Sequence, residues 1–267
     1  MKVKLCGAES LDIIKTFECG QCFRWNADEN GVYHGIVAGH YAQVEVENDA
    51  VYITSDAPEE LWADYFDLGT DYAEISKDFS GEYLRTCTDY GMGIRILRQE
   101  SWEALCSFII SQCNNISRIK GIVERLCEGF GDPIEYGGKV YYSFPSAQRL
   151  AQLTPEELAP IRSGYRAEYI INAAKAVTSG ELDLDKLKEC DYKEAIKALR
   201  TVRGIGEKVA NCVVLFGLYH TEAFPIDVWM KRALKENFPP DFDPETLGKY
   251  AGLAQQYIFY YARSNGK

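Results

Sequence analysis

The spacing of apolar residues changes about a third of the way along this 267-residue chain. Around Ala42–Val46 and Val51–Thr54, apolar and polar side chains alternate as in half-buried strands, and the polar segment between them predicts a turn. From about Ser101 onward, apolar residues recur at helical spacing. We therefore expect an α+β protein with an antiparallel sheet first and helices afterwards, divided into residues 1–90 and 91–267.

The helical patterns have identifiable starts and stops. The segment from Ser101 predicts two helices interrupted at Cys113–Asn115 and ending near Gly129, and a capping box at Thr154 predicts another helix start. Further helices are expected at Glu59–Phe66, Tyr72–Phe79, Ala167–Val177, Tyr192–Leu199, Glu207–Phe216, Asp227–Asn237 and Pro244–Arg263.

The net charge of −11 argues at first sight against a polyanionic partner, but the acidity is local. Residues 1–90 hold 18 acidic and 6 basic side chains, whereas the remaining residues hold 22 and 23. Within Lys193–Lys235, eight basic side chains outnumber four acidic ones. A polyanion can therefore dock on the later part of the chain.

The chain shows no membrane or export signal. Its apolar runs are far shorter than the roughly 20 residues that cross a bilayer, and its first residues lack the apolar stretch of a secretory signal. We expect a cytoplasmic protein without membrane contact, whose nine cysteines are reduced thiols.

Residues 199–218 have the pattern of a helix-hairpin-helix. One helix ends near Thr201, Gly204 and Gly206 allow a tight turn, and the next helix begins near Glu207. Such a turn exposes backbone N–H groups at a helix N-terminus, where a phosphate binds without side-chain charge. This mode of binding explains how an acidic protein could hold DNA.

Lys208 lies in the first turn of this apolar second helix, beside the positive end of the helix dipole. Burial and the dipole both favour the neutral amine, which is the nucleophilic form. On the hairpin alone, a lysine that reaches solvent or a phosphate is the simpler interpretation. Asp227 follows Pro-Ile and precedes a helical pattern, which fits an N-cap. A hairpin lysine with a capping aspartate 19 residues later is far more specific than either alone.

At these residues the chain resembles the HhH-GPD superfamily of DNA glycosylases, and more narrowly the 8-oxoguanine DNA glycosylase/lyases found in eukaryotes and some bacteria. The narrower resemblance covers nearly the whole chain, through "GQCFRW", "NNISRI", "SGYRAEY", "GIGEKVANC" and "YAGLAQQYIF". It implies two helical subdomains with the active site between them. It also implies a bifunctional enzyme of base excision repair, in which Lys208 forms the Schiff base and Asp227 is the catalytic aspartate.

The resemblance also implies how the damaged base is bound. Gly20 matches the glycine whose carbonyl accepts the N7 hydrogen that 8-oxoguanine has and guanine lacks. Cys212 and Phe259 match the residues that pack on the two faces of the flipped base. Gln255 matches the glutamine that contacts its Watson–Crick edge.

Cys19 and Cys22 are then expected to flank a base-binding loop rather than to bind metal. A zinc site needs two further ligands, and no second CxxC or spaced histidine pair is present. A thioredoxin-like redox pair needs a βαβ context that the pattern lacks.

For DNA contacts, the resemblance points to the Tyr165–Arg166 pair, which matches residues that wedge the duplex and contact the estranged cytosine. Asn115 and Arg118 lie in the matching "NNN-x-x-R" region. The chain departs from its relatives at two positions. Cys113 stands where they carry the first asparagine of a triplet, and Trp229 where they carry a phosphate-binding histidine.

The resemblance implies no required cofactor or bound metal, and allows a monovalent or divalent cation at the hairpin when DNA is present. The expected partner is duplex DNA containing 8-oxoguanine, bound by a monomer near the nucleoid. Two alternatives stay open: a glycosylase for another damaged base, and a non-catalytic hairpin module that only binds DNA. The Gly20–Gln255 pair argues against the first, and Lys208 with Asp227 argues against the second.

Overall fold

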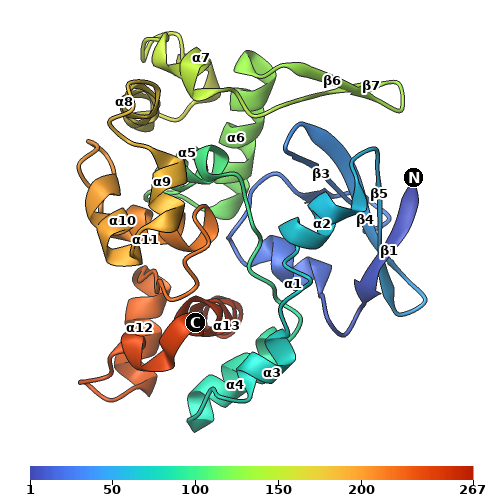
Figure 1. The fold of residues 1–267 in the computed structure, drawn as a ribbon, viewed down its shortest axis with the longest axis vertical. Helices are drawn as coiled ribbons and strands as arrows, with labels where there is room; N and C mark the ends of the chain where they lie inside the picture. Colours follow the sequence, from blue (N-terminus) through green and yellow to red (C-terminus); the bar gives the residue numbers. More distant parts are fainter. Residues whose placement is uncertain (267) are drawn as a thin grey trace.

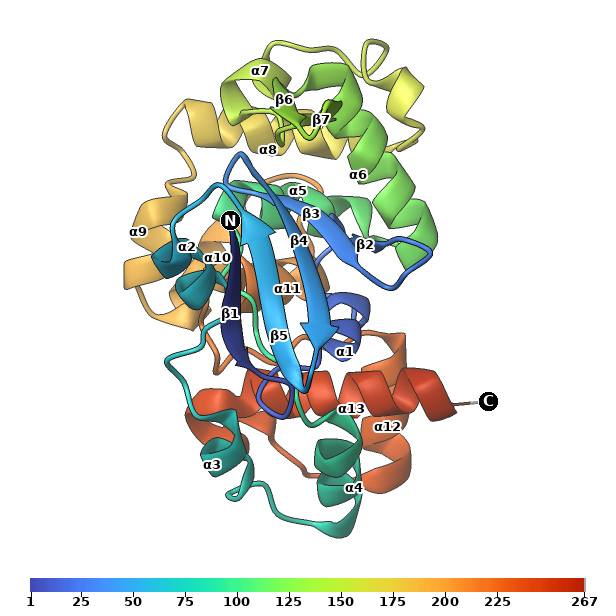
Figure 2. The same ribbon diagram turned by 90° about the vertical axis from the view of Figure 1, so that its right-hand side faces the viewer.

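A five-stranded antiparallel sheet lies along one side of the molecule, with helices behind it and at both ends (Figures 1 and 2). The computed structural model describes residues 1–266. The sheet has the order β1-β5-β4-β3-β2. Its strands are β1 Lys2–Gly7, β2 Asn26–Ala27, β3 Tyr33–Val37, β4 His40–Glu47 and β5 Ala50–Ser55.

The two predicted strands are β4 and β5, and they pair as an antiparallel hairpin. Asn48 and Asp49 form the turn with φ of 48° and 57°, the left-handed backbone that short hairpin turns require and that Asn and Asp tolerate. Val44 lies opposite Ile53, and both are buried. Alternation therefore gives the sheet an apolar inner face, which packs with the aromatic residues Phe17, Trp25, Trp62 and Phe66.

The helical part follows the expected order and confirms the α+β fold class. A second small sheet pairs β6 Pro133–Tyr136 with β7 Lys139–Tyr142. The helices are α1 Ile13–Glu18, α2 Glu59–Tyr65, α3 Tyr72–Ser76, α4 Glu82–Gly91, α5 Ser101–Ile110, α6 Ile116–Phe130, α7 Ala147–Ala151, η1 Ala159–Ile161, α8 Arg166–Thr178, α9 Leu184–Glu189, α10 Tyr192–Leu199, α11 Glu207–Phe216, α12 Val228–Asn237, η2 Pro244–Tyr250 and α13 Ala251–Asn265.

Two helix predictions were wrong in extent. The capping box forms, since Thr154 and Glu157 exchange reciprocal side-chain to backbone bonds, but only a turn and the short η1 follow. Pro160 and the left-handed Arg162 end the helical backbone there. The predicted helix from Pro244 is broken at Gly248, whose φ of 70° interrupts the helical backbone inside η2, and α13 begins only at Ala251.

The helices at the lower end of Figure 1 come from distant parts of the chain. α3 and α4 precede the long helical segment in sequence, yet α4 packs against α13 near the C-terminus, beside α12. We propose that the chain divides into residues 1–90 and 91–267, with the boundary at the end of α4. The packing of α4 against α13 then joins the two parts.

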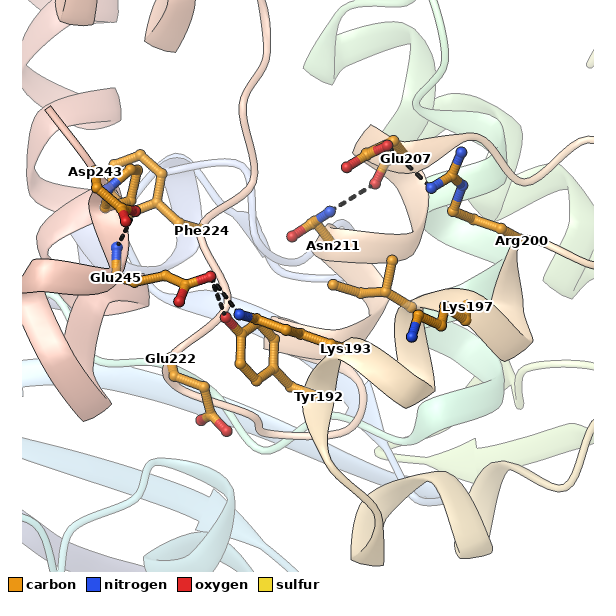
Figure 3. A pocket seen from close by; sticks show the side chains of 12 residues that line it. Tyr192, Lys193, Lys197, Arg200, Glu207, Asn211, Glu222, Phe224, Asp243 and Glu245 are labelled. Atoms are coloured by element: carbon orange, nitrogen blue, oxygen red, sulfur yellow. Dashed lines mark hydrogen bonds and ion pairs between the residues drawn. The ribbon is translucent and has the colours of Figure 1, made fainter. Parts of the chain in front are cut away.

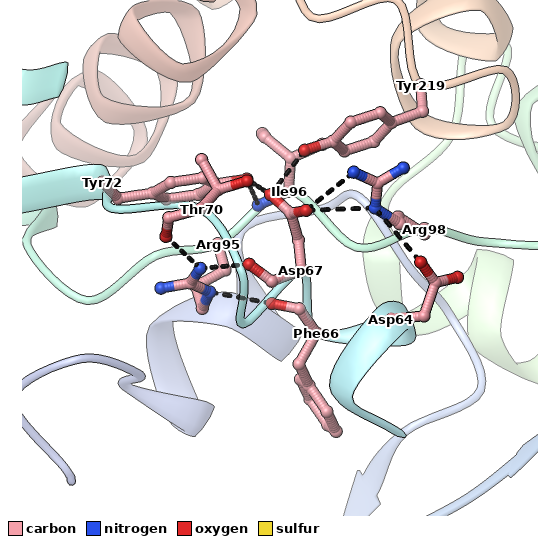
Figure 4. A network of polar contacts seen from close by, with 9 residues as sticks. All are labelled: Asp64, Phe66, Asp67, Thr70, Tyr72, Arg95, Ile96, Arg98 and Tyr219. Atoms are coloured by element: carbon pink, nitrogen blue, oxygen red, sulfur yellow. Dashed lines mark hydrogen bonds and ion pairs between the residues drawn. The ribbon is translucent and has the colours of Figure 1, made fainter. Parts of the chain in front are cut away.

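A buried polar network holds the sheet part against the helices (Figure 4). The Asp67 carboxylate accepts hydrogen bonds from the Tyr72 hydroxyl at 2.9 Å, from Arg98 Nη2 at 2.8 Å and from the Tyr219 hydroxyl. Arg95 donates to the backbone carbonyls of Ser10, Phe66, Asp67 and Thr70. Each buried charge is thus compensated, and the network connects the end of α2, the linker of residues 92–100 between α4 and α5, and the chain after α11.

A second buried pair lies between the loop after α1 and helix α5. Arg24 Nη1 is 3.5 Å from the Glu103 carboxylate, and its other nitrogen donates to the Tyr142 carbonyl in β7. Burial of the carboxyl raises the pKa of Glu103 to about 7, although Arg24 opposes the shift. Desolvation therefore outweighs the ion pair at this position.

The raised pKa predicts a pH-dependent stability term. The folded protein holds the Glu103 proton more tightly than the unfolded chain, so this contribution is complete below about pH 4.5 and is lost as pH rises through 7. Between these values, the free energy of unfolding of the wild type should fall relative to that of Glu103→Gln by on the order of 3 kcal/mol. Urea unfolding of both proteins across the range measures it. A constant difference would mean that Glu103 stays ionised in the folded state.

Candidate active site

A small pocket opens between α11, α13 and the loop after α1. Its lining consists of Cys19, Gly20, Phe108, Lys208, Cys212, Phe216, Pro225, Asp227, Gln255, Gln256 and Phe259. All six residues that the sequence predicts for catalysis and base binding are in this set, although they come from four separate segments. Their individual roles remain predictions.

Lys208 is held against α5 at the wall of the pocket. Its Nζ lies 3.2 Å from Ser111 Oγ and 5.6 Å from the centre of the Phe108 ring. The Ser111 hydroxyl donates its hydrogen to the Phe108 carbonyl at 2.8 Å, so its oxygen accepts from the lysine. Among residues 1–266 this amine thus donates to a neutral hydroxyl and forms no ion pair with a carboxylate, which suits a nucleophile.

Cys212 follows Lys208 by one helical turn and is buried. Burial raises the pKa of its thiol, while the neighbouring Lys208 opposes that shift. The sulfur is therefore a neutral thiol at neutral pH, a soft apolar surface against which a ring can pack.

Asp227 caps α12, as its sequence context predicts. One carboxylate oxygen accepts from the Met230 backbone N–H at 2.8 Å. The cap fixes the side chain at the pocket.

The loop that carries Gly20 is fixed by its neighbour Gln21, which is fully buried. The Gln21 amide donates to the carbonyls of Arg95 at 2.7 Å and Thr16 at 3.1 Å, and accepts from the Leu97 N–H at 2.9 Å. Sequence patterns give this glutamine no such role, because its bonds to Arg95 and Leu97 join residues 74 and 76 positions apart. The loop is therefore rigid where it meets the pocket.

Gly20 itself has a φ of +82°, a backbone that favours glycine. A Cβ at this position would lie 3.5 Å from Phe259 Cε1, so the glycine and the aromatic ring face each other. Within residues 1–266 no hydrogen bond is made to the Gly20 carbonyl, which leaves an acceptor available beside the pocket.

The two cysteines of this loop are free thiols with no reactive character. Burial raises the pKa of Cys19 to about 12 and also raises the pKa of Cys22. Metal binding and redox exchange both need the thiolate, which this environment disfavours. The expectation that they only flank the loop stays the better interpretation.

Of the predicted DNA contacts, Tyr165 is exposed and Arg166 is not. Tyr165 is 52% exposed and follows Gly164, whereas Arg166 is 4% exposed. The Arg166 guanidinium donates to the carbonyls of Gln112, Cys113 and Ser163 and stacks on the Tyr165 ring. In this structure Arg166 therefore holds the turn between α5 and α6, and a direct contact with a base would require it to exchange those bonds.

The turn between α5 and α6 presents the other predicted contacts. Asn115 caps α6 by accepting from the Arg118 N–H at 2.9 Å, and both side chains are exposed. Cys113 is exposed with a φ of 47°. Gln112 donates to the Gly204 carbonyl at 3.0 Å, which links this turn to the hairpin.

The two hairpin glycines are under different constraints. Gly204 has a φ of +100°, and a Cβ there would overlap the Tyr169 ring, whereas Gly206 has an ordinary φ of −84° and open space around it. Gly204 is needed for the close approach to α8. Gly206 leaves the N-terminus of α11 uncovered.

A larger hollow lies beside the same hairpin, outside the predicted site (Figure 3). Its charged side chains are largely paired, Lys193 with Glu245 at 2.6 Å and Arg200 with Glu207 at 3.1 Å. Acidic residues line it as well, so it does not have the character of a phosphate site.

The different surroundings of Gly204 and Gly206 predict that alanine at the two positions lowers the free energy of unfolding by different amounts. Gly204→Ala should lower the free energy of unfolding by roughly 2–5 kcal/mol, because it combines a left-handed backbone with a steric overlap. Gly206→Ala, the matched control, should cost less than about 1 kcal/mol. Thermal or urea unfolding measures both. Equal losses would show that the hairpin does not approach α8 as described.

Comparison with known proteins agrees with this geometry. Residues 106–246 match the family described as HhH-GPD superfamily base excision DNA repair protein, and residues 4–105 match the 8-oxoguanine DNA glycosylase N-terminal domain. The N-glycosylase/DNA lyase OGG1 of Arabidopsis thaliana is 32% identical over 283 residues, covering 93% of this chain and 76% of that protein.

Two solved structures superimpose along nearly the whole chain. MBOgg1 in complex with a low affinity DNA ligand has a TM-score of 0.92 and 41% identity, covering 100% of this chain and 96% of the other. The 8-oxoguanine glycosylase/lyase of Clostridium acetobutylicum, in complex with double-stranded DNA containing cytosine opposite 8-oxoguanine, has a TM-score of 0.90 and 38% identity, covering 97% and 94%. The chain therefore belongs to the HhH-GPD superfamily of base excision DNA repair proteins, and within it to the N-glycosylase/DNA lyases of the OGG1 type.

Proposed function

We propose that this protein removes 8-oxoguanine from duplex DNA and then cleaves the strand at the resulting abasic site. The observation that carries the proposal is one pocket that is lined by Lys208 and Asp227 together with Gly20 and Gln255. A module that only binds phosphate needs none of these groups. A glycosylase for another base has no use for an acceptor at Gly20 that matches the N7 hydrogen of 8-oxoguanine.

The reaction begins with extrusion of the damaged nucleotide into the pocket, at an unstacking cost of a few kcal/mol. Cys212 and Phe259 then pack on the two faces of the base, and Gln255 contacts its edge. The buried lining excludes water around the base, which strengthens each polar contact. Base binding and catalysis thus share one small enclosure.

Lys208 supplies the nucleophile. Its neutral amine attacks C1′ of the sugar as the bond to the base breaks, and the base leaves with the bonding electrons. The Asp227 carboxylate stabilises the positive charge that develops on the sugar, as carboxylates do in glycoside chemistry. One oxygen of the Asp227 carboxylate caps α12, so the carboxylate is already oriented before the reaction.

The covalent intermediate explains strand cleavage. After loss of the amine protons and opening of the sugar ring, a Schiff base joins C1′ to Lys208. Removal of a C2′ proton then expels the 3′ phosphate by β-elimination, and water releases the enzyme. No oxidant, reductant or cofactor is needed for any step.

DNA is held mainly through the backbone. The N–H groups at the start of α11, left open by Gly206, bind a phosphate, and Tyr165 wedges the duplex. Asn115 and Arg118 lie on the turn that Arg166 holds, where they face the opposite strand. A cation at the hairpin in the DNA complex is a further part of the proposal, and backbone carbonyl oxygens of the hairpin turn would hold it.

Lesion recognition through Gly20 gives the experiment that tests the function. Gly20→Ala adds a methyl group beside Phe259 and strains the loop, so excision of 8-oxoguanine should fall roughly 10- to 100-fold. Cleavage of a preformed abasic site should change little, because no base fills the pocket. Single-turnover cleavage of the two duplexes measures the ratio.

Gly39→Ala is the control, since Gly39 also has a positive φ of 78° with open space, but lies at the sheet turn between β3 and β4. It should leave both rates unchanged. If Gly20→Ala reduced both activities equally, Gly20 would be part of the general scaffold and the lesion assignment would fail.

A further inference from the structure

We propose that Gln256 is a positioning residue for base recognition: it fixes the amide of Gln255 so that the carbonyl oxygen of Gln255 is held in one orientation toward the base. The proposal rests on the proposed function of the pocket. The family resemblance implies a role for Gln255 and none for Gln256.

The observation is a chain of two amides inside the pocket wall. Gln255 and Gln256 are 3% and 2% exposed, and both line the pocket. Gln255 Nε2 donates to the Pro225 carbonyl at 3.0 Å, and Gln256 Nε2 donates to Gln255 Oε1 at 2.9 Å. Two adjacent buried glutamines are uncommon, because each amide needs partners that an apolar interior does not supply.

The direction of this chain follows from its first member. A backbone carbonyl can only accept, so the nitrogen of Gln255 must face Pro225. The oxygen of Gln255 then faces Gln256, where only an N–H group can satisfy it. The usual ambiguity between the two ends of an amide side chain is thus removed for both residues. With Gln256 present, rotation of the Gln255 amide breaks two hydrogen bonds, whereas without it only the bond to the Pro225 carbonyl would be broken.

The second amide has no other structural task among the described residues. The Gln256 oxygen is buried without a hydrogen-bond partner, and the Gln256 nitrogen donates to Gln255. An apolar side chain of similar size would avoid that unsatisfied oxygen. The amide is therefore explained by what it does to Gln255.

The fixed orientation has a chemical consequence. Gln255 Oε1 keeps a second lone pair, and the oxygen of Gln256 keeps both, so this wall of the pocket is rich in acceptors. Such a wall fits a guanine-type Watson–Crick edge, which offers the N1–H and 2-amino groups as donors. An adenine-type edge presents an unprotonated N1 and is disfavoured.

The test replaces the donor without changing the shape. In Gln256→Glu, a protonated carboxyl can still donate to Gln255 Oε1, whereas an ionised carboxylate can only repel it. Single-turnover excision from an 8-oxoguanine·cytosine duplex should be near the wild-type rate at pH 5.5 and at least 10-fold below it at pH 8.5. Cleavage of a preformed abasic duplex should follow the wild-type profile throughout.

Two further variants complete the experiment. Gln256→Leu removes the donor at every pH, so its excision rate should be about 10-fold low without titration. Gln43→Glu, a similar change at a half-buried position of β4 outside the pocket, should behave as the wild type. Abasic-site cleavage at the wild-type rate verifies that each variant is folded. If Gln256→Glu fails this check, the comparison of Gln256→Leu with the wild type tests the proposal.

The outcomes separate the two claims. If the wild type excises 8-oxoguanine and both Gln256 variants match it at every pH, the positioning role is wrong and the proposed function stands. The role is also wrong if both substrates are cleaved more slowly in parallel, since that indicates general disruption. If the wild type leaves the 8-oxoguanine duplex intact, the proposed function and this inference both fall.

Discussion

The close approach of the hairpin to α8 is the constraint on which the site depends. Because Gly204 has no side chain, the turn lies directly on the Tyr169 ring, and Gln112 fixes the Gly204 carbonyl from the neighbouring turn. These contacts set where α11 begins and how it faces α5. Lys208, one residue into that helix, is thereby placed against Ser111 at the pocket wall. Its position is set by backbone packing and not by an ion pair.

The sheet part contributes a rigid loop to this arrangement. Gln21 and the Arg95 network attach the segment after α1 to the linker that leads into the helices, so Gly20 has a fixed place opposite Phe259. The strong acidity of this part accounts for the net charge of the chain, while the hairpin that we propose as the phosphate site offers neutral N–H groups. An acidic protein can hold DNA in this way because the phosphate contacts are local. No helix within residues 1–266 is both long and apolar enough to span a membrane.

What the sequence could predict was determined by local pattern. Alternation indicated β4 and β5, glycine spacing indicated the hairpin, and the context of Asp227 indicated a helix cap, all of which depend on neighbours within a few residues. Long-range partners were beyond such patterns. The roles of Gln21 and Ser111 in fixing Gly20 and Lys208 appear only when segments about 75 to 100 residues apart are brought together. For Arg166, the family resemblance implies a contact with the estranged cytosine, and in this structure its buried guanidinium donates to the carbonyls of Gln112, Cys113 and Ser163.

The most direct test of the account is to locate the covalent bond to DNA. Incubation of the protein with an 8-oxoguanine·cytosine duplex and sodium borohydride should reduce the Schiff base to a stable adduct, and mass spectrometry of the digested complex should place it on Lys208 alone. A duplex with undamaged guanine should give no adduct. An adduct on another amine, or none with the damaged duplex, would contradict the assignment of this pocket as the site of glycosylase and lyase chemistry.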